Sequence, residues 1–211
     1  MRAVIFANGI LTDPAAQRHF LHPDDLVIAA NGGTVHALAL GVTPHVVVGD
    51  MDSLSPSLRA ELEATGTCFV AHPPAKDETD LELALLYAAA RHVEAILVLA
   101  ALGGRLDQAL ANVFLLALPQ LAGIDVRVAD GNQVAFLVRD QATLSGRPGD
   151  TVSFIPLGGD AHGVTTEGLS WTLRDETLHF GPARGVSNAL LGQDARVFVR
   201  EGYLLCVIIH R

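Results

Sequence analysis

The sequence lacks long apolar runs, since no stretch approaches the roughly 18 residues that a membrane-spanning helix requires. The apolar start at residues 3–7 is too short for a signal-peptide core and runs directly into Asn8 and Gly9. Basic residues are also scarce, with 14 Lys and Arg against 23 Asp and Glu, for a formal net charge of −9. Nucleic acids and anionic membranes are held by basic patches, so this balance argues against both as partners.

The chain also has few cysteines and few aromatic residues, and its histidines are not clustered. The two cysteines, Cys68 and Cys206, are far apart and have no metal-ligand spacing, which favours a reducing cytoplasm. The nine histidines are scattered, and aromatic residues make up only 5% of the chain. The single tryptophan, Trp171, is expected in the core of a strand. We therefore expect a soluble, cytoplasmic protein that binds small molecules.

What the sequence does contain is an alternation of apolar runs and helical patterns over its first two thirds. Strands are expected at residues 4–7, 26–30, 46–48, 68–71, 94–101, 124–129 and 133–138. Helices are expected near residue 14, at 34–40, after Ser55 or Ser57, at 79–92 and at 106–117. This order predicts an α/β fold with a mostly parallel, Rossmann-like sheet and helices on both of its faces.

The pattern changes near residue 141, where glycines begin to punctuate short alternating runs. Such runs predict a small antiparallel β domain, with Arg200–Gly202 turning its last hairpin. At 211 residues the chain can hold one large domain or two small ones. We expect a catalytic α/β domain at residues 1–139 and a β domain at residues 140–211.

Polar residues follow several of the predicted strands: Asn31, Asp50, the segment 76–80 and the segment 105–107. Ligands bind outside the carboxyl ends of parallel strands, so these residues should gather at one edge of the sheet. In an extended backbone Asp50 and Asp52 would point the same way, roughly 6.5 Å apart, and could share a divalent cation. Hard oxygen donors favour Mg²⁺, which commonly joins carboxylates to the phosphates of a nucleoside triphosphate.

Each of these residues also has an ordinary structural interpretation. Asp50 and Asp52 could be solvated turn residues, and Asp80 could serve only the dipole of the helix that it begins. Lys76 and Asp77 could be an exposed loop pair. The helical spacing of Leu106, Leu110, Val113, Phe114 and Ala117 predicts the buried face of a helix, with Asn112 on its polar stripe.

Four blocks in this order resemble the thiamine pyrophosphokinase family: GDMDS at 49–53, KDETDLELAL at 76–85, GGRLDQALANV at 103–113 and GVSNAL at 185–190. The resemblance covers nearly the whole chain. It implies an α/β catalytic domain followed by a β-sandwich domain, in a homodimer with sites between subunits. The implied reaction transfers the pyrophosphoryl group of ATP to the hydroxyl of thiamine, giving thiamine diphosphate and AMP.

The resemblance also implies roles for individual residues. Mg²⁺ would be held by Asp50, Asp52 and Asp80. The ATP site would be formed by Asn31, Gly32, Lys76, Asp77, Thr79, Arg105 and Gln108. The thiamine site would be formed by Asp107, Ser187 and Asn188. The residues implied in catalysis are Asp50, Asp52, Asp80, Arg105 and Asp107.

Two positions depart from the family pattern. Asn31 stands where the family usually has Asp, and the segment Leu204–Cys206 lacks the tryptophan that stacks on thiamine in animal members. Three other functions therefore stay open. These are pyrophosphoryl transfer to another alcohol such as a hydroxymethyl pterin, a phosphatase of the haloacid-dehalogenase type with Asp50 as nucleophile, and a non-catalytic nucleotide sensor.

Overall fold

The computed structural model describes residues 1–211, the side chain of residue 16 excepted, and divides them into two compact units, Met1–Gly131 and Asn132–Arg211. The second unit begins before the expected boundary at residue 139, because strand β7 (Gln133–Val138) pairs with the last strand of the chain, β14 (Leu204–Ile209). No helix in the part of the chain that is described has the length and apolar character needed to cross a bilayer.

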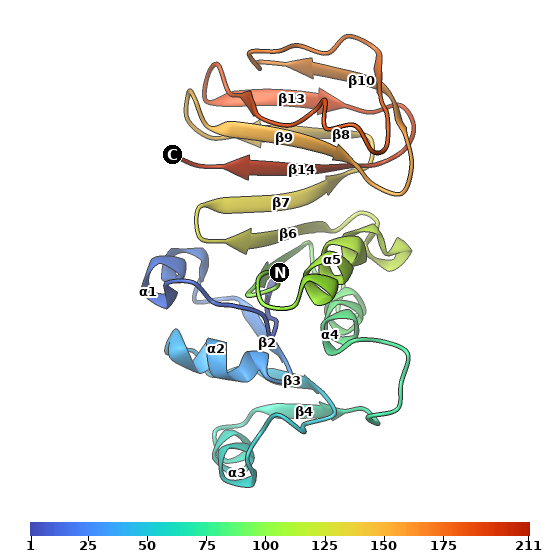
Figure 1. The fold of residues 1–211 in the computed structure, drawn as a ribbon. Helices are drawn as coiled ribbons and strands as arrows, with labels where there is room; N and C mark the ends of the chain where they lie inside the picture. The colour runs from blue at the N-terminus through green and yellow to red at the C-terminus, as the bar shows by residue number, and fades with distance from the viewer. The chain divides into compact units, whose positions relative to one another are not determined.

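The first unit alternates strands and helices, as the sequence predicts (Figure 1). Its elements are β1 (Arg2–Phe6), α1 (Pro14–Gln17), η1 (Arg18–Phe20), β2 (Leu26–Ala30), α2 (Gly33–Ala39), β3 (Val46–Gly49), α3 (Pro56–Ala64), β4 (Cys68–Ala71), α4 (Asp80–Ala89), β5 (Ala95–Leu99), α5 (Leu106–Phe114), η2 (Leu115–Ala117), η3 (Pro119–Leu121) and β6 (Asp125–Asp130). Its strands lie in the order β6-β5-β1-β2-β3-β4, and every neighbouring pair among them is parallel.

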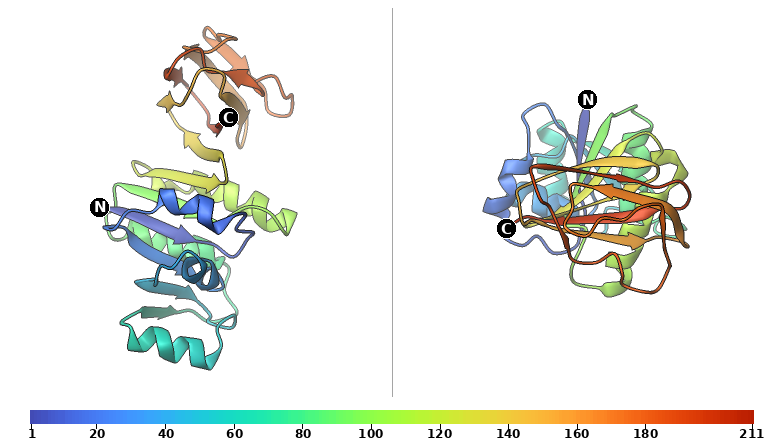
Figure 2. Two further views of the ribbon diagram at one scale, coloured as in Figure 1. Left: turned by 90° about the vertical axis from the view of Figure 1, so that its left-hand side faces the viewer. Right: turned by 90° about the horizontal axis from the view of Figure 1, so that it is seen from above.

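Helices cover both faces of this parallel sheet. Figures 1 and 2 show α1, α2 and α3 on one face and α4 and α5 on the other. Right-handed crossovers require this arrangement, because the chain moves one way from β1 to β4 and then returns past β1 to β5. The strands β1, β2, β3 and β5 are almost entirely buried, as expected for a sheet covered on both faces.

Side-chain caps begin two of these helices at the positions expected from the sequence. The Ser55 hydroxyl accepts a hydrogen bond from Leu58 N at 3.2 Å and begins α3, which has Pro56 in its first turn. The Thr79 hydroxyl likewise accepts from Glu82 N at 3.2 Å and begins α4. The cap at Thr79 places Asp80 in the first turn of α4, at the carboxyl edge of the sheet.

The second unit is a β sandwich of two antiparallel sheets. Besides β7 and β14, its strands are β8 (Gln141–Ser145), β9 (Thr151–Pro156), β10 (Ala161–Glu167), β11 (Glu176–Leu178), β12 (Asn188–Ala189) and β13 (Asp194–Phe198). One sheet has the order β12-β9-β14-β7 and the other β11-β10-β13-β8. Phe136, Phe154, Leu144 and Val197 meet in the core between them.

The expected last hairpin is wrong. Residues 200–202 do not join two paired strands, because β13 pairs with β8 and β10 while β14 pairs with β7 and β9. The segment instead carries the chain from one sheet of the sandwich to the other. A hairpin signal is local, whereas the choice of strand partner depends on which face each strand buries.

Asp150 ties the C-terminus to the turn between β8 and β9. Its carboxylate is 1% exposed and accepts hydrogen bonds from Arg147 N at 2.9 Å and Arg211 N at 3.1 Å. His210 Nδ1 lies 2.8 Å from the same carboxylate. These contacts, the Arg147 N–H foremost, lower the pKa of Asp150 to about 2.

Replacing Asp150 by Asn should therefore destabilise the protein by about 2 kcal/mol at neutral pH. The pKa of Asp150 is lower in the folded than in the unfolded chain, so its stabilisation is present above the unfolded pKa of 3.8 and is lost as the pH falls toward about 2. Urea unfolding at several pH values measures the difference from wild type. Asp194→Asn, at an exposed carboxylate, is the control, and a difference that stays constant down to pH 2.5 would contradict this account.

Candidate active site

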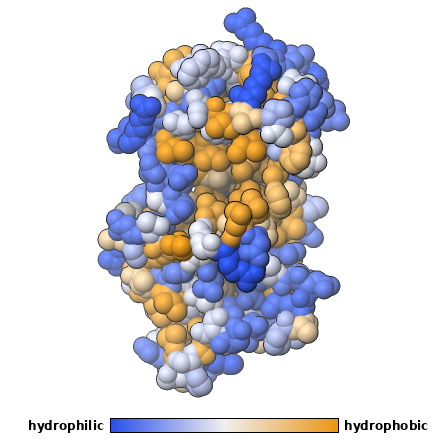
Figure 3. Space-filling model, viewed as in Figure 1, coloured by the Kyte–Doolittle hydropathy of each residue, from blue (hydrophilic) through white to orange (hydrophobic). Residues whose placement is uncertain are grey.

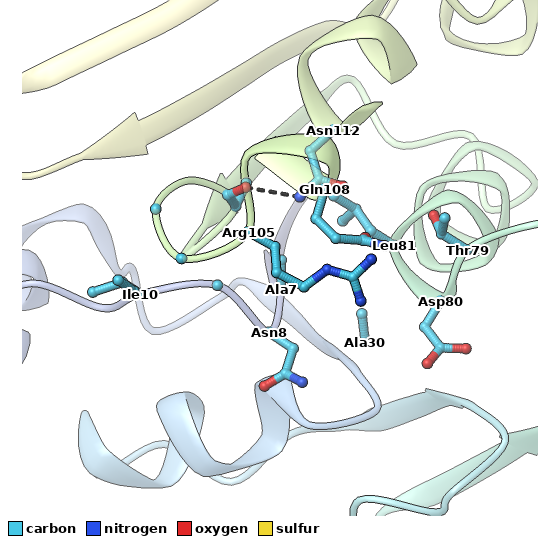
Figure 4. A pocket seen from close by; sticks show the side chains of 14 residues that line it. Ala7, Asn8, Ile10, Ala30, Thr79, Asp80, Leu81, Arg105, Gln108 and Asn112 are labelled. Atoms are coloured by element: carbon cyan, nitrogen blue, oxygen red, sulfur yellow. Dashed lines mark hydrogen bonds between the residues drawn. The ribbon is translucent and has the colours of Figure 1, made fainter. Parts of the chain in front are cut away.

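A cavity lies at the ends of the central strands β1 and β5, where the connections to the next strands run in opposite directions across the sheet. After β1 the chain moves toward β2, whereas after the neighbouring β5 it moves toward β6. The two loops are joined by hydrogen bonds from Gly9 N to Ala100 O at 2.7 Å and from Ile10 N to Leu102 O at 2.9 Å. Ligands bind at such a switch point in parallel sheets, and a cavity of about 490 Å³ lies here (Figure 4).

The ends of three strands and the beginnings of two helices line this cavity. The lining residues are Ala7, Asn8, Gly9, Ile10, Ala30, Thr79, Asp80, Leu81, Ala101, Gly103, Gly104, Arg105, Gln108 and Asn112. Four of the residues expected in the site are among them: Thr79, Asp80, Arg105 and Gln108. Figure 4 shows the Arg105 side chain extending into the cavity on the side where Asp80 lies.

Arg105 and Asp107 form an exposed ion pair at the beginning of α5. Arg105 donates to Asp107 through Nη2 at 2.5 Å and through Nε at 3.1 Å. Gln108 N also donates to this carboxylate, at 2.9 Å. The hydrogen bond from Arg105 is the main cause that lowers the pKa of Asp107, and its partner raises the pKa of Arg105. Asp107 is therefore a stable carboxylate, better suited to accepting a hydrogen bond than to removing a proton.

Lys76 is held inside the site and is not a freely solvated loop residue. Its side chain is 12% exposed, and its Nζ lies 2.9 Å from Asp80 Oδ1. The neighbouring Asp77 is exposed. The segment 76–80 thus directs the ammonium group of Lys76 toward Asp80.

Asp50 and Asp52 are brought together by a shared donor. Asn31 Nδ2 lies 2.8 Å from Asp50 Oδ1 and 2.8 Å from Asp52 Oδ1. Both oxygens contact one nitrogen, so they also lie within reach of one cation. The Asn31 hydrogen bond, followed by that of the Ser53 hydroxyl, lowers the pKa of Asp52.

The expected reason for this pairing is wrong. β3 ends at Gly49, so Asp50 and Asp52 do not lie on one side of an extended strand. Met51 between them has φ +65° and is buried against Ala29 and Val47. Burial of the Met51 side chain therefore holds the turn that presents the two acids.

Gly49 is required by the crowding beside these acids. A Cβ atom at this position would lie 2.9 Å from Asn31 Cβ and 2.9 Å from Asp80 Cγ, and Gly49 has φ +146°. Asn31 and Asp80 therefore approach the same backbone atom from two sides. Glycine is also needed at the buried position 32, because a Cβ atom there would lie 2.5 Å from the Asn8 side chain.

The β sandwich carries a second cavity, of about 610 Å³. Its lining residues are Phe154, Ser170, Trp171, Thr172, Leu173, Arg184, Gly185, Val186, Ser187 and Asn188. Asn188 is 8% exposed, accepts a hydrogen bond from Trp171 N at 3.0 Å and donates to Trp171 O at 2.7 Å. Ser187 is exposed in a turn with φ +65°. The GVSN block therefore builds one wall of this cavity and holds the segment that carries Trp171.

Comparison with known families fits both units. The family model "Thiamin pyrophosphokinase, catalytic domain" matches residues 17–128, and "Thiamin pyrophosphokinase, vitamin B1 binding domain" matches residues 140–204. The chain belongs to the thiamine pyrophosphokinase family. Among curated relatives, thiamine pyrophosphokinase of Bacillus subtilis is 28% identical over 184 residues, 86% of each chain.

Solved structures of the thiamine pyrophosphokinase family have the same fold. The Bacillus subtilis protein superposes with a TM-score of 0.87 at 25% identity over 100% of both chains. The Geobacillus thermodenitrificans protein gives 0.85 at 25% identity, over 99% of this chain and 97% of its own. Thiamin pyrophosphokinase from Candida albicans gives 0.80 at 17% identity, over 99% of this chain and 88% of its own, which shows the fold alone.

The acidic residues of this family member fit a hard divalent cation. Asp50 and Asp52 offer gathered carboxylate oxygens, and the buried Asn31 Oδ1 has no hydrogen-bond partner among the described residues. Asp80 is close to Gly49 but is paired with Lys76. Within the described side chains, no three His, Cys, Asp or Glu residues are gathered as a metal site. Two acids are thus in place, and Asp80 is adjacent to them.

Three other expectations about side chains are wrong. Asn112 is buried, not on a polar stripe, and its Nδ2 donates to Ala101 O at 2.7 Å, which ties α5 to the loop after β5. The exposed stripe of α5 is the apolar one, with Leu106 73% and Phe114 57% exposed. Trp171 lies outside the strands and is 65% exposed, beside Asn188.

Sequence reasoning did not assign Asn8, Asn112 or Trp171 to a site. A signal for Asn8 is its position directly after the strand expected at residues 4–7, as Asn31 follows the strand expected at residues 26–30. For Asn112, the periodicity of α5 predicted an exposed position on the polar stripe of the helix. For Trp171, no local pattern indicated its cavity.

Proposed function

We propose that this chain transfers the terminal diphosphoryl group of ATP to the hydroxyl of thiamine, yielding thiamine diphosphate and AMP. The observation that carries the proposal is the pairing of Asp50 with Asp52 directly after Gly49, which is approached by Asp80 from a cavity that Arg105 enters. Family membership supports ATP and thiamine as the substrates. It does not favour a pterin alcohol as the acceptor.

The residues of the parallel sheet would hold and align the triphosphate. In the transfer, the thiamine hydroxyl oxygen forms a bond to the β-phosphorus while the bond from that phosphorus to the α,β-bridging oxygen breaks, and the hydroxyl proton is released. Asp50, Asp52 and Asp80 would hold Mg²⁺, which supplies charge neutralisation on the phosphates when bound. Arg105, Lys76 and Thr79 would contact phosphate oxygens, with Asn31, Gly32, Asp77 and Gln108 around the nucleotide.

Asp107 would orient the acceptor. Its lowered pKa, caused chiefly by Arg105, keeps it ionised at neutral pH. An ionised carboxylate accepts a hydrogen bond from an alcohol and so directs the oxygen lone pair toward phosphorus. The ion pair with Arg105 would also couple the position of the alcohol to that of the phosphates.

The cavity of the β sandwich would bind thiamine. Ser187 and Asn188 line it, and Trp171 offers an exposed indole at the same cavity. Thiamine contains a cationic thiazolium ring and an aromatic pyrimidine, both of which stack favourably on an indole. Trp171 would thereby supply the aromatic surface that the segment Leu204–Cys206 lacks.

Trp171→Ala should raise KM for thiamine about tenfold and leave KM for ATP unchanged, because the indole contacts only the acceptor. Steady-state kinetics with each substrate varied in turn measures the effect. Trp171→Phe should restore most of the affinity. Phe180→Ala, which removes another exposed aromatic residue of the same unit, is the matched control. Equal losses in Trp171→Ala and Phe180→Ala would count against a stacking role.

Product analysis tests the proposed reaction. The protein is incubated with Mg-ATP and thiamine, and nucleotides and thiamine esters are separated by chromatography. AMP and thiamine diphosphate in equal amounts are expected, whereas ADP as the product would contradict the proposal. A parallel reaction with a hydroxymethyl pterin compares the two acceptors. Tight Mg-ATP binding without any turnover would indicate a nucleotide sensor.

We also propose a cytoplasmic homodimer. The outer face of the sheet β12-β9-β14-β7 carries Ile155, Leu137 and Val207 on the side away from the core. Figure 3 shows apolar side chains gathered over β14 and β7. An apolar sheet face of this kind favours association with a second copy. Light scattering coupled to size-exclusion chromatography measures the mass, and a monomer at micromolar concentration would contradict this assignment.

A further inference from the structure

The Asn31 side chain is directed at carboxylates. From the sequence it was expected to contact the nucleotide, but its amide nitrogen lies 2.8 Å from both Asp50 Oδ1 and Asp52 Oδ1. An amide nitrogen carries two hydrogens, so each carboxylate receives one of them. The opposite amide orientation would place a carbonyl oxygen against two negative charges. Electrostatics therefore determines which end of the amide faces the acids.

This contact solves a problem that two adjacent carboxylates create. Ionised carboxylates that are close together repel each other unless a cation or a hydrogen-bond donor lies between them. The partial positive charge of the Asn31 amide occupies that position without adding a formal charge. The two acids can therefore lie close together before any cation binds.

The amide can act in this way because Asn31 itself is rigidly held. Its side chain is 5% exposed, and its backbone N donates to Val48 O at 2.9 Å, which joins the ends of β2 and β3. Its carbonyl oxygen accepts hydrogen bonds from Thr34 N at 3.1 Å and Thr34 Oγ1 at 2.7 Å. Its φ of +44° is one that Asn tolerates better than most residues do.

A buried acceptor at the same side chain also points to a ligand. Asn31 Oδ1 is inaccessible to solvent and has no hydrogen-bond partner among the described residues. A buried acceptor without a partner is costly, and a donor group of a ligand bound beside Asn31 would remove that cost. The amide nitrogen is thus satisfied by the two acids, whereas the amide oxygen is left for a bound ligand.

We propose that Asn31 is the positioning residue of the metal site, holding Asp50 and Asp52 ready for a divalent cation. The inference rests on the metal half of the proposed function and is independent of the acceptor. It predicts that loss of the amide weakens cation binding, although Asn31 need not touch the nucleotide. It also predicts that a third carboxylate at this position makes folding dependent on the cation.

Two variants test these consequences with Mg²⁺ or Mn²⁺ alone, without substrates. Asn31→Gly removes the amide and keeps a residue suited to positive φ, and its affinity for either cation should fall by about tenfold. Asn31→Asp replaces the amide that attracts Asp50 and Asp52 by a third carboxylate that repels them. The Tm of this variant in EDTA should be about 5 °C lower than that of the wild type. Saturating Mg²⁺ should restore most of that loss. Calorimetric titration and thermal unfolding supply the two readouts.

Asn132→Asp is the control, because this exposed amide of the second unit donates to the backbone carbonyl of His210. The Tm of this variant should be the same in EDTA and in Mg²⁺. The inference would be overturned if Asn31→Gly bound Mg²⁺ with wild-type affinity and the Tm of Asn31→Asp did not respond to Mg²⁺. Those results would leave the proposed diphosphoryl transfer intact. The expected shifts in a protein that makes no thiamine diphosphate would support the inference and contradict the proposed acceptor.

Discussion

Asp50→Asn should lower kcat for diphosphoryl transfer by about 10³-fold while the protein remains folded. The substitution keeps the size of the side chain and removes one of the two negative charges that Asn31 gathers. With that charge absent, a divalent cation would be held by Asp52 alone and the phosphates would lose alignment. Rapid-quench measurement of AMP formation at saturating substrates gives the effect directly.

Asp24→Asn is the control for this substitution, because Asp24 is an exposed acid of the same unit that lies away from the cavity. It should retain the wild-type rate. Circular dichroism and thermal unfolding should show that Asp50→Asn is folded, since asparagine keeps the size and polarity of the side chain. A loss of less than tenfold in kcat would remove Asp50 from the metal site.

Gly49→Ala should destabilise the protein by about 3 kcal/mol and also reduce activity. The added methyl group would meet Asn31 Cβ and Asp80 Cγ, each at 2.9 Å, and the residue would have to keep φ +146°. Relief of these clashes would move both side chains away from Asp50. Urea unfolding measures the loss of stability, and Mg²⁺ titration measures the loss of the site.

Gly66→Ala separates the two causes of that effect. Gly66 has φ +93°, but a Cβ there would meet nothing within 4 Å. Its substitution should cost about 1 kcal/mol, from backbone conformation alone, and should leave activity unchanged. Equal destabilisation by both substitutions would show that the crowding at Gly49 is not what requires glycine.

The structure also explains why the acids can be close together before ATP binds. Lys76 pairs with Asp80, Arg105 pairs with Asp107, and Asn31 joins Asp50 to Asp52. Asp80 and Asp107 thus each face a basic side chain, and Asp50 and Asp52 share the Asn31 amide. Binding of a cation and a triphosphate would require the Lys76 and Arg105 pairs to rearrange toward the phosphates. Arg105 already lines the cavity.

The sequence by itself determined the alternation of strands and helices and which edge of the sheet carries the polar residues. Gln133–Val138 was expected and observed as a strand, and the caps at Ser55 and Thr79 begin their helices as expected. These features depend on backbone hydrogen bonds and side-chain periods within a few residues. Short-range signals of this kind can be read without knowing the fold.

Only the tertiary structure decided how the polar residues are partnered. Burial of Met51, not strand alternation, turns Asp50 and Asp52 toward Asn31. Asn112 is buried because its side chain donates a hydrogen bond to Ala101 O in the loop after β5. With Asn112 facing inward, the apolar stripe of α5 is exposed. Trp171 is held at its cavity by Asn188. Each outcome depends on residues distant in sequence, because hydrogen-bond partners and buried faces are set by packing between elements.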